Sequence, residues 1–227
     1  MLKRLGEKIW TSASNQTAFG LDIGTRTTVV DIDGNGTLFV HSPLAALTAA
    51  IRDLGNTRYV VIPNKWRGKN AKDFKVQFPE AEILLSVNDG PYPWSEALDH
   101  FVIQGSPLFN EVAFFHKLSK TLILADFAGY LYDGGPLTAQ LGMKLLNSQK
   151  KFGWSDQEKK LYIRDRKAFA ESVEKLLAWD FERVVVAHGP VIEKDVKEKL
   201  REALAPPVPA QSSPAESPEP LPTEPHQ

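Results

Sequence analysis

Two short stretches decide the fold, Thr121-Leu-Ile-Leu-Ala-Asp126 and Val184-Val-Val-Ala-His-Gly189, which lie about 60 residues apart. Each is an apolar run typical of a buried strand, followed directly by a polar side chain. Two earlier apolar runs end in the same way, at His41 and at Asn64. Chemistry in α/β proteins gathers where strands end, because the loops there expose polar groups beside a rigid sheet. We therefore expect His41, Asn64, Asp126 and His188 to mark a site.

The sequence around these stretches alternates between strands and helices in two successive β-rich halves. Residues 27–32 and 38–41 predict a hairpin, because Asp33-Gly-Asn-Gly36 tolerates the positive φ angles of a tight turn. Ser42-Pro43 predicts the start of a helix that closes at Gly55. In the second half, residues 101–104, 111–115 and 121–125 predict strands, with a hairpin at Lys117–Lys120. The capping box Ser155-Asp-Gln-Glu158 predicts one long helix to about Ala178.

This order of elements predicts an α/β (α+β) sandwich with two sheets packed face to face and helices outside, the four-layer αββα arrangement. Neighbouring strands are too frequent for a doubly wound parallel sheet. The G-x-G-x-x-G and Walker-type loops that cradle phosphates do not occur in the sequence. A G-x-S-x-G nucleophile motif does not occur either.

Composition excludes several classes of function. The 227 residues contain no cysteine, which rules out disulfides, thiolate metal sites and cysteine nucleophiles. Lys and Arg number 27 against 28 Asp and Glu, so a polybasic nucleic-acid surface is not expected. The first ten residues have early positive charge without an apolar run behind it, and no stretch is long enough for a membrane-spanning helix. We expect a cytoplasmic protein that binds neither nucleic acid nor membrane.

The composition changes sharply at residue 206. Residues 206–227 contain eight prolines mixed with Ser, Ala and Glu, and such a segment buries too little apolar surface to offset its ordering entropy. We expect a domain over residues 1–205 and a disordered Pro-rich C-terminal tail over residues 206–227. The tail is either a solvated segment, which we favour, or a polyproline ligand for a protein partner.

Several pieces of the sequence together resemble the metallo-β-lactamase superfamily, and more closely an uncharacterised branch of it, a domain family of unknown function. They are Leu38-Phe-Val-His-Ser-Pro43, Val61-Ile-Pro-Asn64, Phe78-Pro-Glu-Ala81, Glu111-Val-Ala-Phe-Phe-His116, Ser119-Lys-Thr-Leu-Ile-Leu-Ala-Asp126 and Trp179-Asp-Phe-Glu-Arg-Val-Val-Val-Ala-His-Gly189. The pieces span about residues 8 to 204. The resemblance implies the αββα fold, with any active site in a cleft at the strand ends.

Active members of the superfamily hold two metal ions with a His-x-His-x-Asp-His loop, a later His, a bridging Asp and a final His. By this resemblance Asp126 matches the bridging Asp and His188 the final His. The other ligand positions do not match: the loop carries Asn64, Trp66, Gly68 and Lys69, and the later His falls near Leu108 or Phe109. A zinc or iron site needs three or more donors, so the resemblance implies a degenerate metal site.

The ammonium group of Lys69 would lie where a metal cation lies in active members. We therefore consider an internal ion pair between Lys69 and Asp126 in place of the metal. Asp126 and His188 are the candidates for catalysis and for metal binding, and His41, Asn64, Trp66 and Lys69 for the pocket. Each has a plainer interpretation: Asp126 caps a turn, His188 orients its loop, and His41 packs. If the site exists, Asp126 and His188 should lie within about 5 Å of each other.

Three functions stay open. The first is a non-catalytic descendant that binds a small molecule or a protein in the old cleft, with no cofactor. The second is a weak mononuclear hydrolase of an ester, amide or phosphoester that uses zinc, manganese or iron and recruits His41 or His116. The third is an interaction protein that acts through its Pro-rich tail. The missing ligand loop places the first ahead of the second.

Overall fold

The computed structural model describes residues 1–14, 17–18, 21–22, 24–64, 71–85, 87–129 and 152–205. Over these residues the chain forms two main sheets. The first has the strand order β1 (Lys3–Gly6), β2 (Ile9–Ser14), β5 (Thr25–Asp31), β6 (Thr37–His41), β7 (Asn56–Val61), β8 (Glu82–Leu84). The second has the order β12 (Arg183–Val185), β11 (Thr121–Ile123), β10 (Val112–His116), β9 (Leu98–Val102). A short pair, β3 (Thr17–Ala18) and β4 (Leu21–Asp22), is separate from both.

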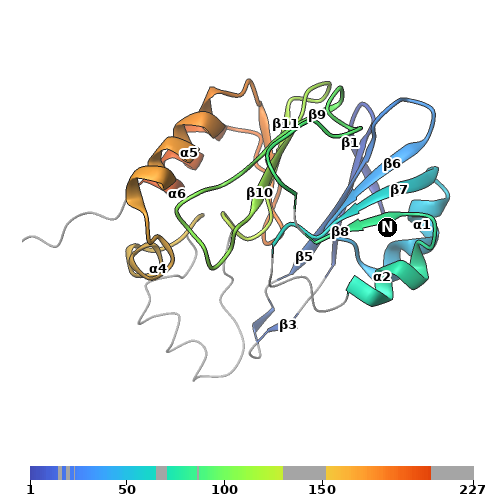
Figure 1. Ribbon diagram of the computed structural model, residues 1–227, viewed down its shortest axis with the longest axis horizontal. Helices are drawn as coiled ribbons and strands as arrows, with labels where there is room; N and C mark the ends of the chain where they lie inside the picture. Colours follow the sequence, from blue (N-terminus) through green and yellow to red (C-terminus); the bar gives the residue numbers. More distant parts are fainter. Residues whose placement is uncertain are drawn as a thin grey trace, which may run out of the picture.

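Helices cover the outer face of each sheet, and the order of the layers is helix, sheet, sheet, helix (Figure 1). The first sheet is covered by the 3-10 turn η1 (Ala45–Leu47), α1 (Thr48–Arg52) and α2 (Ala71–Gln77). The second sheet is covered by α5 (Arg166–Ala178) and α6 (Val196–Leu204), with α4 (Asp156–Tyr162) beside them. The predicted αββα sandwich is confirmed.

Side chains alternate along β6, so this strand packs against a different layer on each of its faces. Leu38 and Val40 point into the cluster beneath α1 and α2, whereas Phe39 points into the cluster between the sheets. Phe39 there packs edge-on against Phe114 of β10, with ring centroids 5.0 Å apart. Both faces of this strand are therefore buried, which explains its continuous apolar sequence.

The predicted hairpin between β5 and β6 forms, but two predicted helices differ from the structure. The chain has a positive φ at Ser42, and the first helical turn begins only at Ala45, so Ser42 is not an N-cap. The long helix expected from Ser155 to Ala178 is broken into α4 and α5. The break occurs because Asp165 caps α5, accepting from the backbone N–H groups of Lys167 and Ala168.

In the described part of the chain, no helix combines the length and the apolar character that crossing a membrane requires. The Pro-rich tail predicted for residues 206–227 lies outside the described residues.

Candidate functional site

Asp126 and His188 meet where two neighbouring strands end. Parallel strands β11 and β12 run side by side, so the residues that follow them emerge at the same edge of the sheet. The Nε2 atom of His188 lies 2.9 Å from Oδ1 of Asp126, and both side chains are only about 15% exposed, at 16% and 14%. The expected proximity is confirmed, and it takes the form of a direct contact between the two side chains.

The other ring nitrogen of His188 fixes how this contact is protonated. Nδ1 lies 2.9 Å from the carbonyl oxygen of Gly24, which directly precedes β5 of the first sheet. A carbonyl oxygen only accepts hydrogen bonds, so Nδ1 carries a proton. Nε2 faces a carboxylate oxygen and donates to it when Asp126 is ionised. In that arrangement both ring nitrogens act as donors, Nδ1 to Gly24 and Nε2 to Asp126.

Asn64 joins the first sheet to this pair. It follows β7, is buried, and donates through Nδ2 to Oδ2 of Asp126 at 2.6 Å. The same nitrogen lies 3.4 Å from Oε2 of Glu111. Both carboxylate oxygens of Asp126 therefore face N–H donors, one from each sheet. The amide stands at the first position of the expected ligand loop and acts here as a donor of hydrogen bonds.

Glu111 is a site residue that sequence reasoning missed. Its side chain is 1% exposed, and its oxygens accept backbone N–H groups from Ala125 at 2.8 Å, Asp126 at 2.7 Å and Phe127 at 2.9 Å. Burial, and then the charge of Asp126, raise the pKa of Glu111 to about 8, while these hydrogen bonds oppose the shift. Glu111 thus holds the backbone of the turn that presents Asp126.

The predicted hairpin contained the signal that would have found Glu111. A turn at Lys117–Lys120 pairs His116 with Thr121, as observed. Continuing the same antiparallel register along the two strands places Glu111 opposite Asp126. A carboxylate there, next to a candidate site residue, would have stood out as a partner.

Arg26, on the first sheet, donates hydrogen bonds to the loop that contains His188. Sequence reasoning also missed this residue. This buried side chain donates from Nε to the carbonyl oxygen of Val186 at 3.2 Å and from Nη2 to that of Gly189 at 2.7 Å. Its Nη1 lies 3.3 Å from Oγ1 of Thr11. Together with the carbonyl group of Gly24, Arg26 positions the loop on both sides of His188.

Residues of the loop after β11 and of the segment before α4 flank the pair. The indole Nε1 of Trp154 donates to the backbone oxygen of Asp126 at 3.3 Å. Gly129 lies so close to His188 that a Cβ atom at this position would be 3.0 Å from the carbonyl oxygen of His188. A side chain there would displace the histidine loop.

Two of the other predicted site residues cannot be placed. Trp66 and Lys69 lie outside the described residues, so the ion pair between Lys69 and Asp126 stays a prediction. His41 is buried and packs edge-on against Phe114 between the sheets, with ring centroids 5.8 Å apart, which agrees with a packing role. His116 lies at the opposite end of β10 from Glu111, where its Nδ1 atom is 2.7 Å from Oγ of Ser119, so the structure does not bring it to the pair.

The donors of this site do not fit a metal ion in their present arrangement. In the part of the chain that the structure describes, no group of three or more His, Asp or Glu side chains is placed to hold one. The pair itself offers only two family ligand positions. His188 turns Nε2 toward Asp126, and Asn64 presents an N–H donor where a ligand would present a lone pair.

Comparison with known proteins identifies the fold. No family model and no curated protein match the chain. It is similar to the crystal structure of the DIM-1 metallo-β-lactamase exposed to ceftazidime, with 15% identity and a TM-score of 0.60, covering 90% of this chain and 95% of that one. A metallo-β-lactamase from Pontibacter korlensis has 14% identity and a TM-score of 0.58, with 90% and 98% covered.

The metal-soaked Flv1 flavodiiron core from Synechocystis sp. PCC6803 has 11% identity and a TM-score of 0.62. The match covers 90% of this chain and 60% of the flavodiiron chain. These likenesses show that the chain has the metallo-β-lactamase fold.

Proposed function

We propose that this metallo-β-lactamase-fold chain is a non-catalytic binding domain, in which hydrogen-bonded side chains occupy the place of the metal centre. The observation that carries this proposal is the 2.9 Å contact between Nε2 of His188 and Oδ1 of Asp126, with Nδ1 of His188 facing the carbonyl oxygen of Gly24. A histidine that binds a metal needs a free lone pair on one nitrogen, and here both nitrogens face oxygen acceptors.

The partners of Asp126 and Glu111 explain how two neighbouring carboxyl groups are accommodated at the strand ends. Asp126 and Glu111 are two carboxyl groups at one buried position, where each needs hydrogen-bond donors around it. In this chain Nε2 of His188 faces Asp126, and the amide Nδ2 of Asn64 faces both Asp126 and Glu111. Removing one partner of a buried pair leaves an uncompensated charge, which costs about 3–5 kcal/mol in well-buried cases.

The ligand of such a domain would bind at the strand ends, beside the partly exposed pair. We expect a small molecule with hydrogen-bonding groups, because the exposed edges of Asp126 and His188 are polar and the walls around them are aromatic. A protein that inserts a side chain into the same cleft would use the same groups.

Metal content tests the proposal directly. The protein is purified without chelator and without metal-affinity resin, and its zinc, manganese and iron are measured by elemental analysis. We expect less than a tenth of an equivalent of any of these per chain, unchanged in His188→Ala. About one equivalent per chain that disappears in His188→Ala would contradict the proposal.

One observation favours a weak mononuclear metallohydrolase as the second candidate. The contact of Nδ1 of His188 with a backbone carbonyl is the arrangement that metal-binding histidines use to orient the ring. Loss of the Nε2 proton would turn His188 into a ligand beside Asp126. In that case added zinc or manganese raises the melting temperature and produces esterase or phosphodiesterase activity that Asp126→Asn and His188→Gln both abolish.

A further inference from the structure

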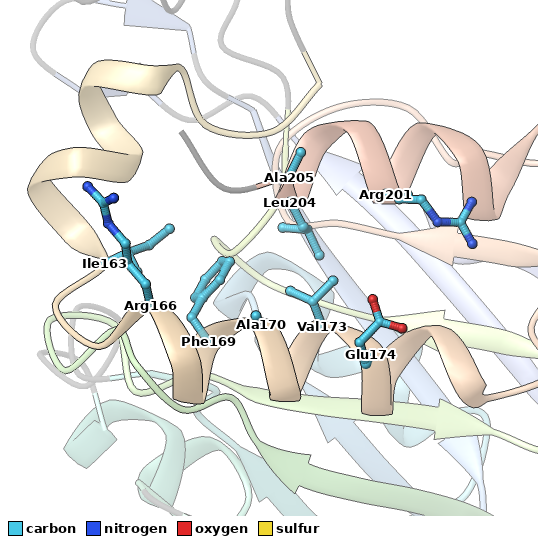
Figure 2. A pocket seen from close by; sticks show the side chains of 9 residues that line it. All are labelled: Ile163, Arg166, Phe169, Ala170, Val173, Glu174, Arg201, Leu204 and Ala205. Atoms are coloured by element: carbon cyan, nitrogen blue, oxygen red, sulfur yellow. The ribbon is translucent and has the colours of Figure 1, made fainter. Parts of the chain in front are cut away.

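A pocket lies between the outer helices α5 and α6 (Figure 2). It encloses about 150 Å³, a size that holds one small apolar group. Its floor consists of the buried side chains Ile163, Phe169, Val173 and Leu204. Its rim carries exposed charged residues, and Figure 2 shows Arg166 and Arg201 toward opposite ends of it.

The two rim arginines are not compensated. Among the residues that the structure describes, neither Arg166 nor Arg201 forms an ion pair, although other basic residues of the same layer do, as in Lys167 with Glu171. Glu174 is the single acidic side chain that lines the pocket. The pocket therefore suits an occupant with an apolar centre and negative charges on either side of it.

The chain itself continues from the edge of this pocket. Leu204 and Ala205, the last described residues, both line it, and 22 residues follow, from Pro206 to Gln227. That segment has no Lys or Arg and three glutamates. Its largest apolar side chain, Leu221, stands between Pro220 and Pro222 with Glu219 and Glu224 on either side.

We propose that the pocket between α5 and α6 binds the chain's own C-terminal segment, with Leu221 in the apolar floor and Glu219 and Glu224 at Arg166 and Arg201. Fifteen residues lie between Ala205 and Leu221, and this stretch reaches roughly 50 Å when extended, which is enough for Leu221 to return to the pocket. A proline-rich segment loses less conformational entropy on docking than a segment without proline, because each proline ring fixes φ. The tether also gives an effective concentration in the millimolar range, so modest contacts suffice.

Docking there would stiffen the layer that supports Asp126. Phe169 of the pocket floor packs against Phe127, with ring centroids 5.3 Å apart, and near Trp154, whose indole bonds to the backbone of Asp126. The proposal does not depend on whether the cleft at the strand ends binds a metal or another ligand.

Paramagnetic labelling tests this proposal in the full-length protein. Because the chain has no cysteine, Thr223→Cys provides a unique site for a nitroxide. We expect the label to broaden the amide NMR signals of Ala170, Val173 and Leu204, and to leave those of Ile51 in the opposite helical layer unchanged. High salt should weaken the broadening, because it screens pairs of exposed charges.

Variants identify the groups involved. Leu221→Ser and the double change Glu219→Lys/Glu224→Lys should each abolish the broadening, and Glu216→Lys, farther from Leu221, should leave it. Adding Arg166→Glu/Arg201→Glu to the double lysine variant should restore it, since exposed side chains are exchanged and the helices stay intact. Unaffected signals in the wild type, or broadening seen only when labelled and unlabelled chains are mixed, would overturn the proposal.

Discussion

The site depends on single side chains at the strand ends. Asp126, His188 and Asn64 could be selected from the sequence because each follows an apolar run directly. Glu111 could not be selected in that way, because it begins a strand and its role depends on the strand opposite. Arg26 lies at the start of the chain, and only the folded structure shows it reaching Val186 and Gly189. Arg26 acts through contacts about 160 positions along the chain and leaves no local signal.

Glu111→Gln should destabilise the protein by about 1–3 kcal/mol near neutral pH, because the amide group places a donor where an oxygen accepts backbone N–H groups. Chemical denaturation measures this free energy. The matched control is Glu202→Gln on the exposed face of α6, which should stay within about 0.5 kcal/mol of the wild type.

The pKa of Glu111 also predicts a dependence on pH. It is raised from 4.5 to about 8 in the folded state, so the folded state binds more protons than the unfolded state between these values. The contribution of this group to stability is then fully present below about 4.5 and declines as the pH rises through 8. The difference in unfolding free energy between wild type and Glu111→Gln should shrink from pH 6.5 to pH 8.5. A difference that grows over this range would contradict the assignment.

At the scale of the elements, the periodic segments were predicted best. The β5–β6 hairpin and the β10–β11 hairpin form as expected, because turn residues such as Gly34 and Gly36 at positive φ fix them locally. Strands β1 and β2 at the start of the chain were missed. The sequence from Lys3 to Ser14 is mostly polar and contains only short apolar runs. The conformation of these strands depends on pairing, β2 with β5 and β1 with β2.

The break between α4 and α5 gives a prediction about capping. Asp165→Ala should lose about 1 kcal/mol of unfolding free energy, because two backbone N–H groups of α5 lose their acceptor. Asp165→Asn keeps a capping oxygen and should lose less than half of that amount. Thermal and urea denaturation of the three proteins compare the effects. Equal losses in the two variants would show that the charge of Asp165 matters and the cap does not.

At the scale of the whole molecule, the site consists of contacts between the ends of the two sheets. Composition and the order of elements predicted the αββα sandwich, because each apolar run needs a second layer to cover it. Composition and element order could not predict that the strand ends of the first sheet lie against those of the second sheet. That placement depends on contacts such as Asn64 with Asp126 and Arg26 with Gly189, each joining residues more than 60 positions apart.

Arg26→Met tests these contacts between the two sheets. The side chain keeps its bulk and loses three hydrogen bonds, so the carbonyl groups of Val186 and Gly189 lose their buried donor. We expect amide hydrogen exchange to become faster in residues 183–189 by at least about tenfold, equivalent to about 1.4 kcal/mol. Arg183→Met is the control, because that arginine pairs with Glu193 at the surface. Similar exchange in the two variants would mean that Arg26 does not hold the loop.

The protonation of His188 tests the central claim most directly. Nitrogen-15 NMR of the five histidines, with His188→Gln used for assignment, reports whether each ring nitrogen carries a proton. A ring that donates to both Asp126 and Gly24 predicts a proton on each nitrogen of His188, with signals unchanged by added zinc. An Nε2 signal without a proton that shifts when one equivalent of zinc is added would contradict the account, because it would make His188 a metal ligand.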